Sequence, residues 1–211
     1  MKGLIISSGD VANYKLLVKL LESHDFILCA DGGIRHLMAV GAIPHLLIGD
    51  LDSVSKAGMN YINKNNIKLL KYPVIKDKTD TELALDYLIR EGFDEITLVG
   101  VTGSRMDHTL SNIFLLKGLN DKGIKGKIVD ENNIIYYSDD YIRVERKEGF
   151  YTSVVPISNK GAKVTLQGFL YPLENHLIKF GSTLGVSNQI VNEYGVVKII
   201  EGECLIITSK D

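Results

Sequence analysis

The chain has 211 residues, of which 45% are hydrophobic and 24% are charged, and its formal net charge is −2. This length allows one large domain or two small ones with a hydrophobic core, and the composition is ordinary for a globular protein. The slightly negative charge argues against binding to nucleic acid through bulk electrostatics. No segment is long and apolar enough to cross a membrane, so we expect neither a nucleic-acid partner nor a membrane partner.

Two features bear on the cellular compartment. The first ten residues contain too short an apolar run for a signal peptide. The two cysteines, Cys29 and Cys204, are far apart in the sequence, and each lies within an apolar run. This pattern favours buried free thiols over a zinc site, and we therefore expect a cytoplasmic protein.

Apolar runs alternate with helical patterns through the first 130 residues. The segment 11–23, for example, repeats leucines at helical spacing between two short apolar runs. Such alternation predicts βαβ units and a parallel sheet. The predicted strands are residues 4–6, 26–30, 46–48, 67–72, 95–100 and 124–130, and the predicted helices are residues 11–23, 34–40, 55–65, 80–90 and 104–119.

The pattern changes near residue 130, beyond which no long segment has a helical period. We therefore predict an α/β protein with an N-terminal three-layer domain and a mostly parallel sheet in residues 1–130. A C-terminal all-β sandwich or barrel domain is predicted for residues 131–211. The predicted strands of this second domain are residues 134–137, 141–145, 151–156, 163–169, 196–200 and 204–208.

Aspartates follow the predicted strands of the first domain. Asp31 comes directly after one strand, Asp50 and Asp52 follow the next, and Asp80 and Asp107 come after two others, past short loops. The carboxyl ends of parallel strands meet at one edge of the sheet, where open α/β sheets bind ligands. Because convergent carboxylates repel one another unless a cation neutralises them, the pattern predicts a hard divalent cation and a phosphorylated substrate.

These acidic segments also have a purely structural explanation. In an extended stretch Asp50 and Asp52 point to the same side and can hold Mg²⁺, but Gly-Asp and Asp-Ser are also common in polar turns. Thr79 and Glu82 have the spacing of a capping box. That spacing places Asp80 in the first helical turn, where the helix dipole favours a carboxylate without any metal.

The loop at residues 100–108 carries a second kind of signal. A glycine-bearing loop between a strand and a helix offers free N–H groups to a phosphate. Ser104 and Asp107 have cap spacing, which is the structural explanation. Arg105 does not fit it, because a cation in the first turn opposes the helix dipole unless a polyphosphate binds there.

Two other loops can contribute to an anion site. Gly32 and Gly33 allow a ligand to approach the backbone closely, although Asp31 can also be the N-cap of the helix that follows. Lys76 and Lys78 can meet phosphate oxygens or stay solvated. The Walker and dinucleotide-binding patterns are absent from the sequence, which argues against a loop-lysine kinase and a dinucleotide dehydrogenase.

The ordered set of motifs resembles the thiamine pyrophosphokinase family. The family's Ala-Asp-Gly-Gly, Gly-Asp-x-Asp-Ser and Thr-Asp motifs fall at residues 30–33, 49–53 and 79–80 here. Its glycine-rich loop ending in Arg-x-Asp-His falls at residues 103–108, and its later substrate motif resembles residues 183–188. Each motif is short, but the ordered set spans nearly the whole chain.

The resemblance implies transfer of a diphosphoryl group from ATP to thiamine, which gives thiamine diphosphate and AMP. It implies Mg²⁺ bound by Asp50, Asp52 and Asp80, and a homodimer with thiamine at the subunit interface. Ser187 and Asn188 are then expected to contact thiamine. Some relatives stack a tryptophan on thiamine, and this chain has no tryptophan, so the resemblance leaves the stacking residue open.

Such a transfer depends mostly on positioning and charge neutralisation. Arg105 is expected to spread charge as AMP leaves, and Asp80 or Asp107 can accept the proton of the thiamine hydroxyl. The residues expected to be catalytic are Asp52, Asp80, Arg105 and Asp107, and those expected near ATP are Asp31, Gly32, Lys78, Thr79, Gly103, Ser104, Arg105 and His108.

Two other functions fit parts of the sequence. Residues 47–53 resemble the Asp-x-Asp start of haloacid-dehalogenase-like enzymes, which predicts a Mg²⁺-dependent phosphohydrolase with Asp50 as the nucleophile. That pattern usually ends the first strand of such a domain, whereas at least two predicted strands precede it here. The other alternative is a non-catalytic nucleotide sensor in which the β domain reports ATP binding.

Overall fold

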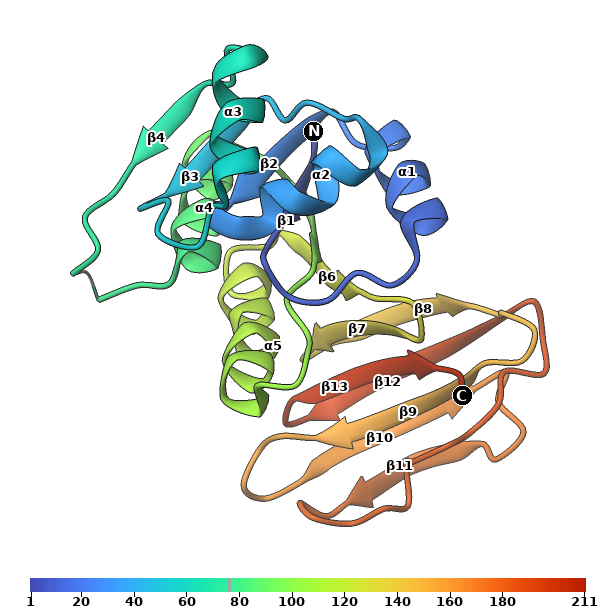
Figure 1. The fold of residues 1–211 in the computed structure, drawn as a ribbon. Coiled ribbons are helices and arrows are strands. Elements are labelled where there is room, and N and C mark those ends of the chain that lie inside the picture. The colour runs from blue at the N-terminus through green and yellow to red at the C-terminus, as the bar shows by residue number, and fades with distance from the viewer. Residues whose placement is uncertain (76) are drawn as a thin grey trace. The chain divides into compact units, whose positions relative to one another are not determined.

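The computed structural model describes residues 1–75 and 77–211, so Lys76, a predicted phosphate contact, lies outside the described residues. The chain divides into two compact units, Met1–Glu131 and Asn132–Asp211, one residue beyond the predicted division (Figure 1). No helix in the described part of the chain is long and apolar enough to span a membrane.

The first unit is built on six strands that all run parallel, in the order β4-β3-β2-β1-β5-β6. Residues 4–6 and 46–48 are buried throughout, as is usual for parallel strands that are covered on both faces. The predicted parallel sheet is confirmed. Its strands are β1 (Lys2–Ile6), β2 (Phe26–Ala30), β3 (Leu46–Gly49), β4 (Leu69–Lys71), β5 (Glu95–Val99) and β6 (Lys125–Val129).

The helices of this unit fall into two groups. The chain moves outward from β1 to β4 and then crosses back to β5 and β6. Right-handed connections in opposite directions place their helices on opposite faces of the sheet. Accordingly, α1, α2 and α3 contact one another in order, and α4 contacts α5. The helices are α1 (Tyr14–Glu22), α2 (Ile34–Val40), α3 (Lys56–Lys64), α4 (Asp80–Arg90) and α5 (Met106–Asn120), and a short 3₁₀ helix, η1 (Asp31–Gly33), precedes α2.

Local signals in the sequence fix several helix ends. Asn13, Ser55 and Thr79 each accept a hydrogen bond from the backbone N–H three residues further on. Such an N-cap is worth about 1 kcal/mol. The Thr79 contact to the Glu82 N–H starts α4 where the capping spacing predicts. Gly41 ends α2 in the left-handed conformation, with φ 69°, as is typical of glycine after a helix.

The second unit is an antiparallel β sandwich, which confirms the predicted all-β domain. Three strands pair in the order β7-β13-β9 and four in the order β11-β10-β12-β8. Val154 and Ile206 from the first set and Val164 and Val197 from the second share one buried core. The strands are β7 (Asn133–Ser138), β8 (Tyr141–Glu145), β9 (Tyr151–Pro156), β10 (Ala162–Gln167), β11 (Leu173–Ile178), β12 (Tyr194–Glu201) and β13 (Cys204–Ser209).

Strand β11 is missing from the strands that the sequence predicts. Its central residues, Glu174, Asn175 and His176, are polar and exposed, and Ile178 is its one buried residue. The strand is held by its pairing with β10. Because it buries so little apolar surface, it lacks the alternating pattern by which a strand is recognised in sequence.

Candidate functional site

Three carboxylates from two strand ends lie together at the carboxyl edge of the parallel sheet. Asp31 follows β2, and Asp50 and Asp52 follow β3. One carboxylate oxygen from each lies within 4.8 Å of the others. The two strands are adjacent, and a Cβ added to Gly49 would lie 3.0 Å from the Asp31 Cβ. The predicted metal ligands Asp50 and Asp52 are therefore brought together, with Asp31 as a third carboxylate.

Asp31 is the buried member of this group, with 5% of its surface exposed. Ser53 Oγ donates a hydrogen bond to its Oδ2. Its Oδ1 is buried and has no hydrogen-bond partner among the residues that the structure describes. A buried, unpartnered carboxylate oxygen is costly, and a bound cation satisfies it. The chemistry of this donor set, all carboxylate oxygens, fits Mg²⁺.

The backbone around these carboxylates is turned and not extended. Asp31 has φ 45° and lies in η1, so the N-cap of α2 is Gly33 and not Asp31. Leu51 has φ 72°, and the Asp52 N–H donates to Asp50 Oδ1 at 3.1 Å. Of the two alternatives for Asp50 and Asp52, the structure has the polar turn, and this turn still gathers their carboxylates.

Asp80 begins α4, and among the described residues it is not part of the group of three carboxylates. The neighbouring Lys78 Nζ lies 2.6 Å from an Asp86 oxygen and 3.2 Å from a Glu82 oxygen. The hydrogen bond to Asp86, followed by that to Glu82, raises the pKa of Lys78. Of the two predicted ATP contacts here, Lys78 is paired with acidic residues of α4 and Thr79 caps that helix.

Arg105 and Asp107 form an exposed pair at the start of α5. The helix begins at Met106, two residues later than predicted, so Ser104 is not its cap and Arg105 precedes the first turn. Arg105 Nη2 lies 2.7 Å from Asp107 Oδ2, and Nε lies 3.3 Å from Oδ1. The hydrogen bond from Arg105 lowers the pKa of Asp107. The predicted conflict between Arg105 and the helix dipole is therefore relieved by position and by this carboxylate.

A cavity of about 300 Å³ lies beside the ends of β1 and β5. The order of the sheet reverses between these strands, since β1 leads toward β2 on one side and β5 leads to β6 on the other. Open α/β sheets bind ligands at such a reversal. The loop after β1 and the loop after β5 both line the cavity. Four predicted ATP contacts are among the lining residues: Gly103, Ser104, Arg105 and His108.

Ser8 connects this cavity with the carboxylates. It lines the cavity, and a Cβ added to Gly32 would lie 3.2 Å from the Ser8 Cβ and 3.5 Å from the Ser53 Cβ. Neither serine is among the site residues predicted from the sequence, although both follow a recognisable pattern. Residues 7–10 follow a strand as the acidic loops do, and Ser53 completes the Gly-Asp-x-Asp-Ser motif.

In the second unit, the two predicted thiamine contacts differ in environment. Ser187 is exposed with φ 58°, and its N–H donates to Ser153 Oγ at 3.0 Å. Asn188 is 6% exposed. Its Nδ2 donates to the Tyr171 carbonyl at 2.8 Å, and its Oδ1 accepts from the Tyr171 N–H at 3.1 Å and the Gln189 N–H at 2.9 Å. Asn188 thus fixes the backbone of Tyr171, whose side chain is 66% exposed.

Comparison with known protein families gives two matches. Residues 17–128 match the catalytic domain of thiamin pyrophosphokinase. Residues 140–202 match the vitamin B1 binding domain of thiamin pyrophosphokinase. The first match covers more than half of the chain and falls within the first unit, and the second falls within the sandwich.

Individual relatives agree with these matches. The chain is 36% identical over 215 residues to thiamine pyrophosphokinase of Bacillus subtilis (strain 168), and all of both chains is covered. The structure is similar to the crystal structure of thiamine pyrophosphokinase from Bacillus subtilis, with a TM-score of 0.90, 31% identity and 100% of both chains covered. It is also similar to that of thiamin pyrophosphokinase from Geobacillus thermodenitrificans, with a TM-score of 0.88, 30% identity and coverage of 100% and 98%.

Proposed function

The chain belongs to the thiamin pyrophosphokinase family, and we propose that this enzyme transfers a diphosphoryl group from ATP to thiamine at the carboxyl edge of its parallel sheet. The thiamine hydroxyl oxygen bonds to the β-phosphorus while the bond from that phosphorus to the α-phosphate oxygen breaks. AMP leaves and the hydroxyl proton is released. The buried Asp31 Oδ1, unpartnered within the described chain and close to two further carboxylates, is the observation that carries this location.

The family match confirms the resemblance inferred from the ordered motifs. It does not favour the phosphohydrolase or the nucleotide sensor. The Asp-x-Asp segment follows the third strand of the unit, β3, whereas the phosphohydrolase pattern usually ends the first strand.

We propose Asp31, Asp50 and Asp52 as ligands of Mg²⁺. Three carboxylates leave coordination positions for water and phosphate oxygens, as Mg²⁺ requires. The bound metal would neutralise negative charge on the diphosphoryl group. Asp80, which the resemblance implies as a ligand, stays a prediction. Its place in the first turn of α4 is explained by the helix dipole alone.

We propose that ATP occupies the cavity beside β1 and β5. Its volume of about 300 Å³ is at the lower end for small-molecule sites and suits part of a nucleotide. The phosphates would then extend past Ser8 toward the three carboxylates. Arg105, held by Asp107 at the N-terminus of α5, stands where free N–H groups and the helix dipole also favour an anion.

The pair of Arg105 and Asp107 also narrows the choice of general base. A carboxylate with a lowered pKa is a weak base near neutral pH. We therefore propose that Asp107 orients Arg105 and does not accept the hydroxyl proton. A loose transition state requires little help from a base, so positioning and charge neutralisation are the main contributions of this site.

We propose that thiamine binds to the second unit near Ser187 and Tyr171. Tyr171 is an exposed aromatic side chain whose backbone is fixed on both sides by the Asn188 amide. It is therefore our candidate for the stacking contact that the sequence leaves open. Replacing Tyr171 by Ala should raise the KM for thiamine about tenfold, whereas Tyr171→Phe should leave it within about threefold. An unchanged KM in Tyr171→Ala would remove Tyr171 from the site.

We also propose a homodimer with thiamine at the subunit interface, as the resemblance implies. Met106, Leu110 and Phe114 are exposed at four-residue spacing on α5, and they form one apolar helix face. An exposed apolar face of this kind suits a protein interface. Replacement of Leu110 and Phe114 by Glu should shift the mass measured by light scattering to that of a monomer.

A cytoplasmic location is likewise a proposal. Cys29 and Cys204 are both buried free thiols, as a reducing compartment allows. Burial raises the pKa of Cys204 to about 12, so this thiol is protonated and unreactive at neutral pH. Production of the protein in an oxidising compartment should therefore leave its enzymatic activity unchanged.

The decisive experiment mixes the full chain with Mg²⁺, ATP and thiamine and identifies the products by chromatography. We expect AMP and thiamine diphosphate in equal amounts. Release of ADP with thiamine monophosphate would mean a simple kinase. Phosphate release without thiamine, together with a trapped phosphoaspartate at Asp50, would establish the phosphohydrolase instead.

A further inference from the structure

Two consecutive residues of α2 hold the loop that follows β1. Arg35 Nη2 donates to the carbonyl oxygens of Ser8 and Gly9, the latter at 3.1 Å. His36 Nε2 lies 2.8 Å from the same Gly9 oxygen. A carbonyl oxygen only accepts, so Nε2 carries the proton of His36, and Nδ1 accepts from the Tyr14 hydroxyl at 3.2 Å.

The same loop is bonded on its other side to the loop after β5. The Gly9 N–H donates to the Gly100 carbonyl at 2.6 Å, and the Asp10 N–H donates to the Thr102 carbonyl at 3.3 Å. A Cβ added to Gly9 would lie 2.6 Å from the Thr102 oxygen and closer still to that of Gly100. Residues 8–10 are therefore held by α2 on one side and by the loop after β5 on the other.

We propose that Arg35 and His36 are positioning residues for nucleotide binding, and that they act through the carbonyl groups of Ser8 and Gly9. This inference rests on the proposed function in one respect, because it takes the cavity beside β1 and β5 as the nucleotide site. Ser8 and Gly9 line that cavity, whereas Arg35 and His36 are not among the described residues that do. His36 is 4% exposed, so its side chain acts through the loop.

The physical effect is on the direction of two peptide dipoles. The three donor contacts hold the negative carbonyl ends of Ser8 and Gly9 toward α2. Without these donors, only the Gly9 and Asp10 N–H contacts hold the two peptide units, and their carbonyls can tilt toward the cavity, where they would repel phosphate oxygens. Arg35 also adds a positive charge directly behind the loop. Its Nη2 carries two N–H groups and makes both contacts at once.

The test measures the dissociation constant of AMP by titration calorimetry and, separately, the KM for ATP and for thiamine. His36→Leu removes the donor to Gly9 at similar volume, His36→Gln restores an N–H, and Arg35→Met removes the guanidinium. We expect His36→Leu, which loses one hydrogen bond to the loop, to weaken AMP binding about tenfold, and Arg35→Met, which loses two, to weaken it at least as much. His36→Gln should stay within about threefold of the original, and the KM for thiamine should not change in any variant.

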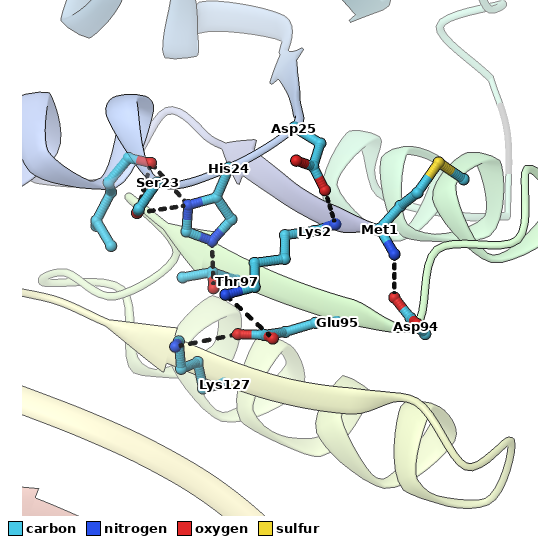
Figure 2. Close-up of polar contacts among 10 residues, drawn as sticks. Met1, Lys2, Ser23, His24, Asp25, Asp94, Glu95, Thr97 and Lys127 are labelled. Atoms are coloured by element: carbon cyan, nitrogen blue, oxygen red, sulfur yellow. Dashed lines mark hydrogen bonds and ion pairs between the residues drawn. The ribbon is translucent and has the colours of Figure 1, made fainter.

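His24→Leu is the matched control. Like His36, His24 bonds a backbone carbonyl, that of Leu20, with its Nδ1 2.7 Å away, and a side-chain hydroxyl, that of Thr97, which lies 2.9 Å from its Nε2 (Figure 2). It lies by the amino ends of the strands and should affect stability alone. A loss of AMP affinity in His24→Leu equal to that in His36→Leu would mean a general loss of rigidity and would overturn the proposal.

The remaining outcomes separate this inference from the proposed function. Unchanged AMP affinity in both His36→Leu and Arg35→Met overturns the positioning role, even if thiamine diphosphate is formed at the normal rate. Failure of the original chain to bind AMP also overturns it. If AMP binds and both variants weaken it, the positioning role stands whether or not thiamine is the acceptor. A failure to form thiamine diphosphate would then count against the proposed function alone.

Discussion

At the amino edge of the parallel sheet, charged side chains neutralise one another, whereas at the carboxyl edge Asp31, Asp50 and Asp52 bring like charges together. Figure 2 shows the amino edge, where Glu95 lies 3.8 Å from Lys2 and 3.6 Å from Lys127. The amino group of Met1 likewise lies beside Asp94. The carboxyl edge instead holds a buried Asp31 oxygen that has no hydrogen-bond partner in the described chain.

The difference shows what each edge does. Mutual pairing satisfies charges without any ligand, so the amino edge is complete in the folded chain. Like charges held close together cost stability unless a cation joins them. The buried Asp31 oxygen, unpartnered among the described residues, therefore offers a place for a cation at the carboxyl edge, and the glycine-bearing loops leave room for one. Charged residues at the amino edge should therefore affect stability, and those at the carboxyl edge should affect function. Substitutions at each edge test this difference.

The largest effect is expected for Asp31→Asn. Removing one carboxylate from the group should lower turnover by about a thousandfold, the loss seen when a main electrostatic contact to a reacting group is removed. The temperature of unfolding without Mg²⁺ should stay the same or rise, because repulsion within the group falls. The matched control is Asp94→Asn at the amino edge, whose partner is the amino group of Met1. It should leave turnover unchanged.

This contrast also marks what the sequence can and cannot predict. Apolar runs and helix caps locate nearly all of the elements, because burial and capping leave local patterns such as the Thr79 contact. The sequence also predicts that Asp50 and Asp52 lie at one edge of the sheet, because both follow the same apolar run. The sequence also places Asp31 at this edge, but it cannot decide between a place beside these carboxylates and a capping role. That depends on its left-handed backbone and on the contact between β2 and β3.

The sequence is also silent on which side chains act through the backbone. Asn188 reads as a substrate contact from its motif, yet its amide is engaged with Tyr171 and Gln189. Contacts between a side chain and a distant carbonyl, such as that of His36 to Gly9, have no local spacing that could predict them. Strand β11 escapes prediction for a related reason, since pairing with β10 and not burial holds it in place.

The second largest effect is expected for the stabilisation of the fold by Mg²⁺. At a Mg²⁺ concentration about a hundred times its dissociation constant, we expect the temperature of unfolding to rise by about 5 °C. The rise should disappear in Asp31→Asn and in Asp52→Asn, because each removes one ligand. Scanning calorimetry with and without EDTA measures it. An equal rise in both variants would show that Mg²⁺ binds elsewhere.

A smaller effect is expected from the titration of His24, by the amino edge of the sheet, and of His36, by the carboxyl edge. Burial is the main cause that lowers the pKa of both His24 and His36 below 6.5. Between the lowered pKa and 6.5 the unfolded chain binds more protons than the folded chain. The contribution of the two histidines to the free energy of unfolding should therefore be complete above pH 6.5 and should decrease as the pH falls below that value.

Single replacements by Gln separate the two contributions. Each should flatten the decline in unfolding free energy measured by urea titration below pH 6.5. The charges that face His36 are Arg35 and Asp10, and those that face His24 are Lys127, Glu95 and Lys2, so both environments are mixed in sign. AMP affinity should change its pH dependence in His36→Gln alone. A similar change in His24→Gln would contradict the functional separation of the edges.

The smallest effect is expected for Glu95→Gln at the amino edge. Glu95 is 29% exposed, and both of its lysine partners lie more than 3.5 Å away, so the loss of unfolding free energy should be below about 1 kcal/mol. Turnover should not change. Glu145→Gln, which removes an exposed contact to Arg143 in the second unit, is the matched control for the loss of a surface carboxylate. If Glu95→Gln lowered turnover while Glu145→Gln did not, charge at the amino edge would be coupled to the site across the sheet, and the division of roles between the two edges would fail.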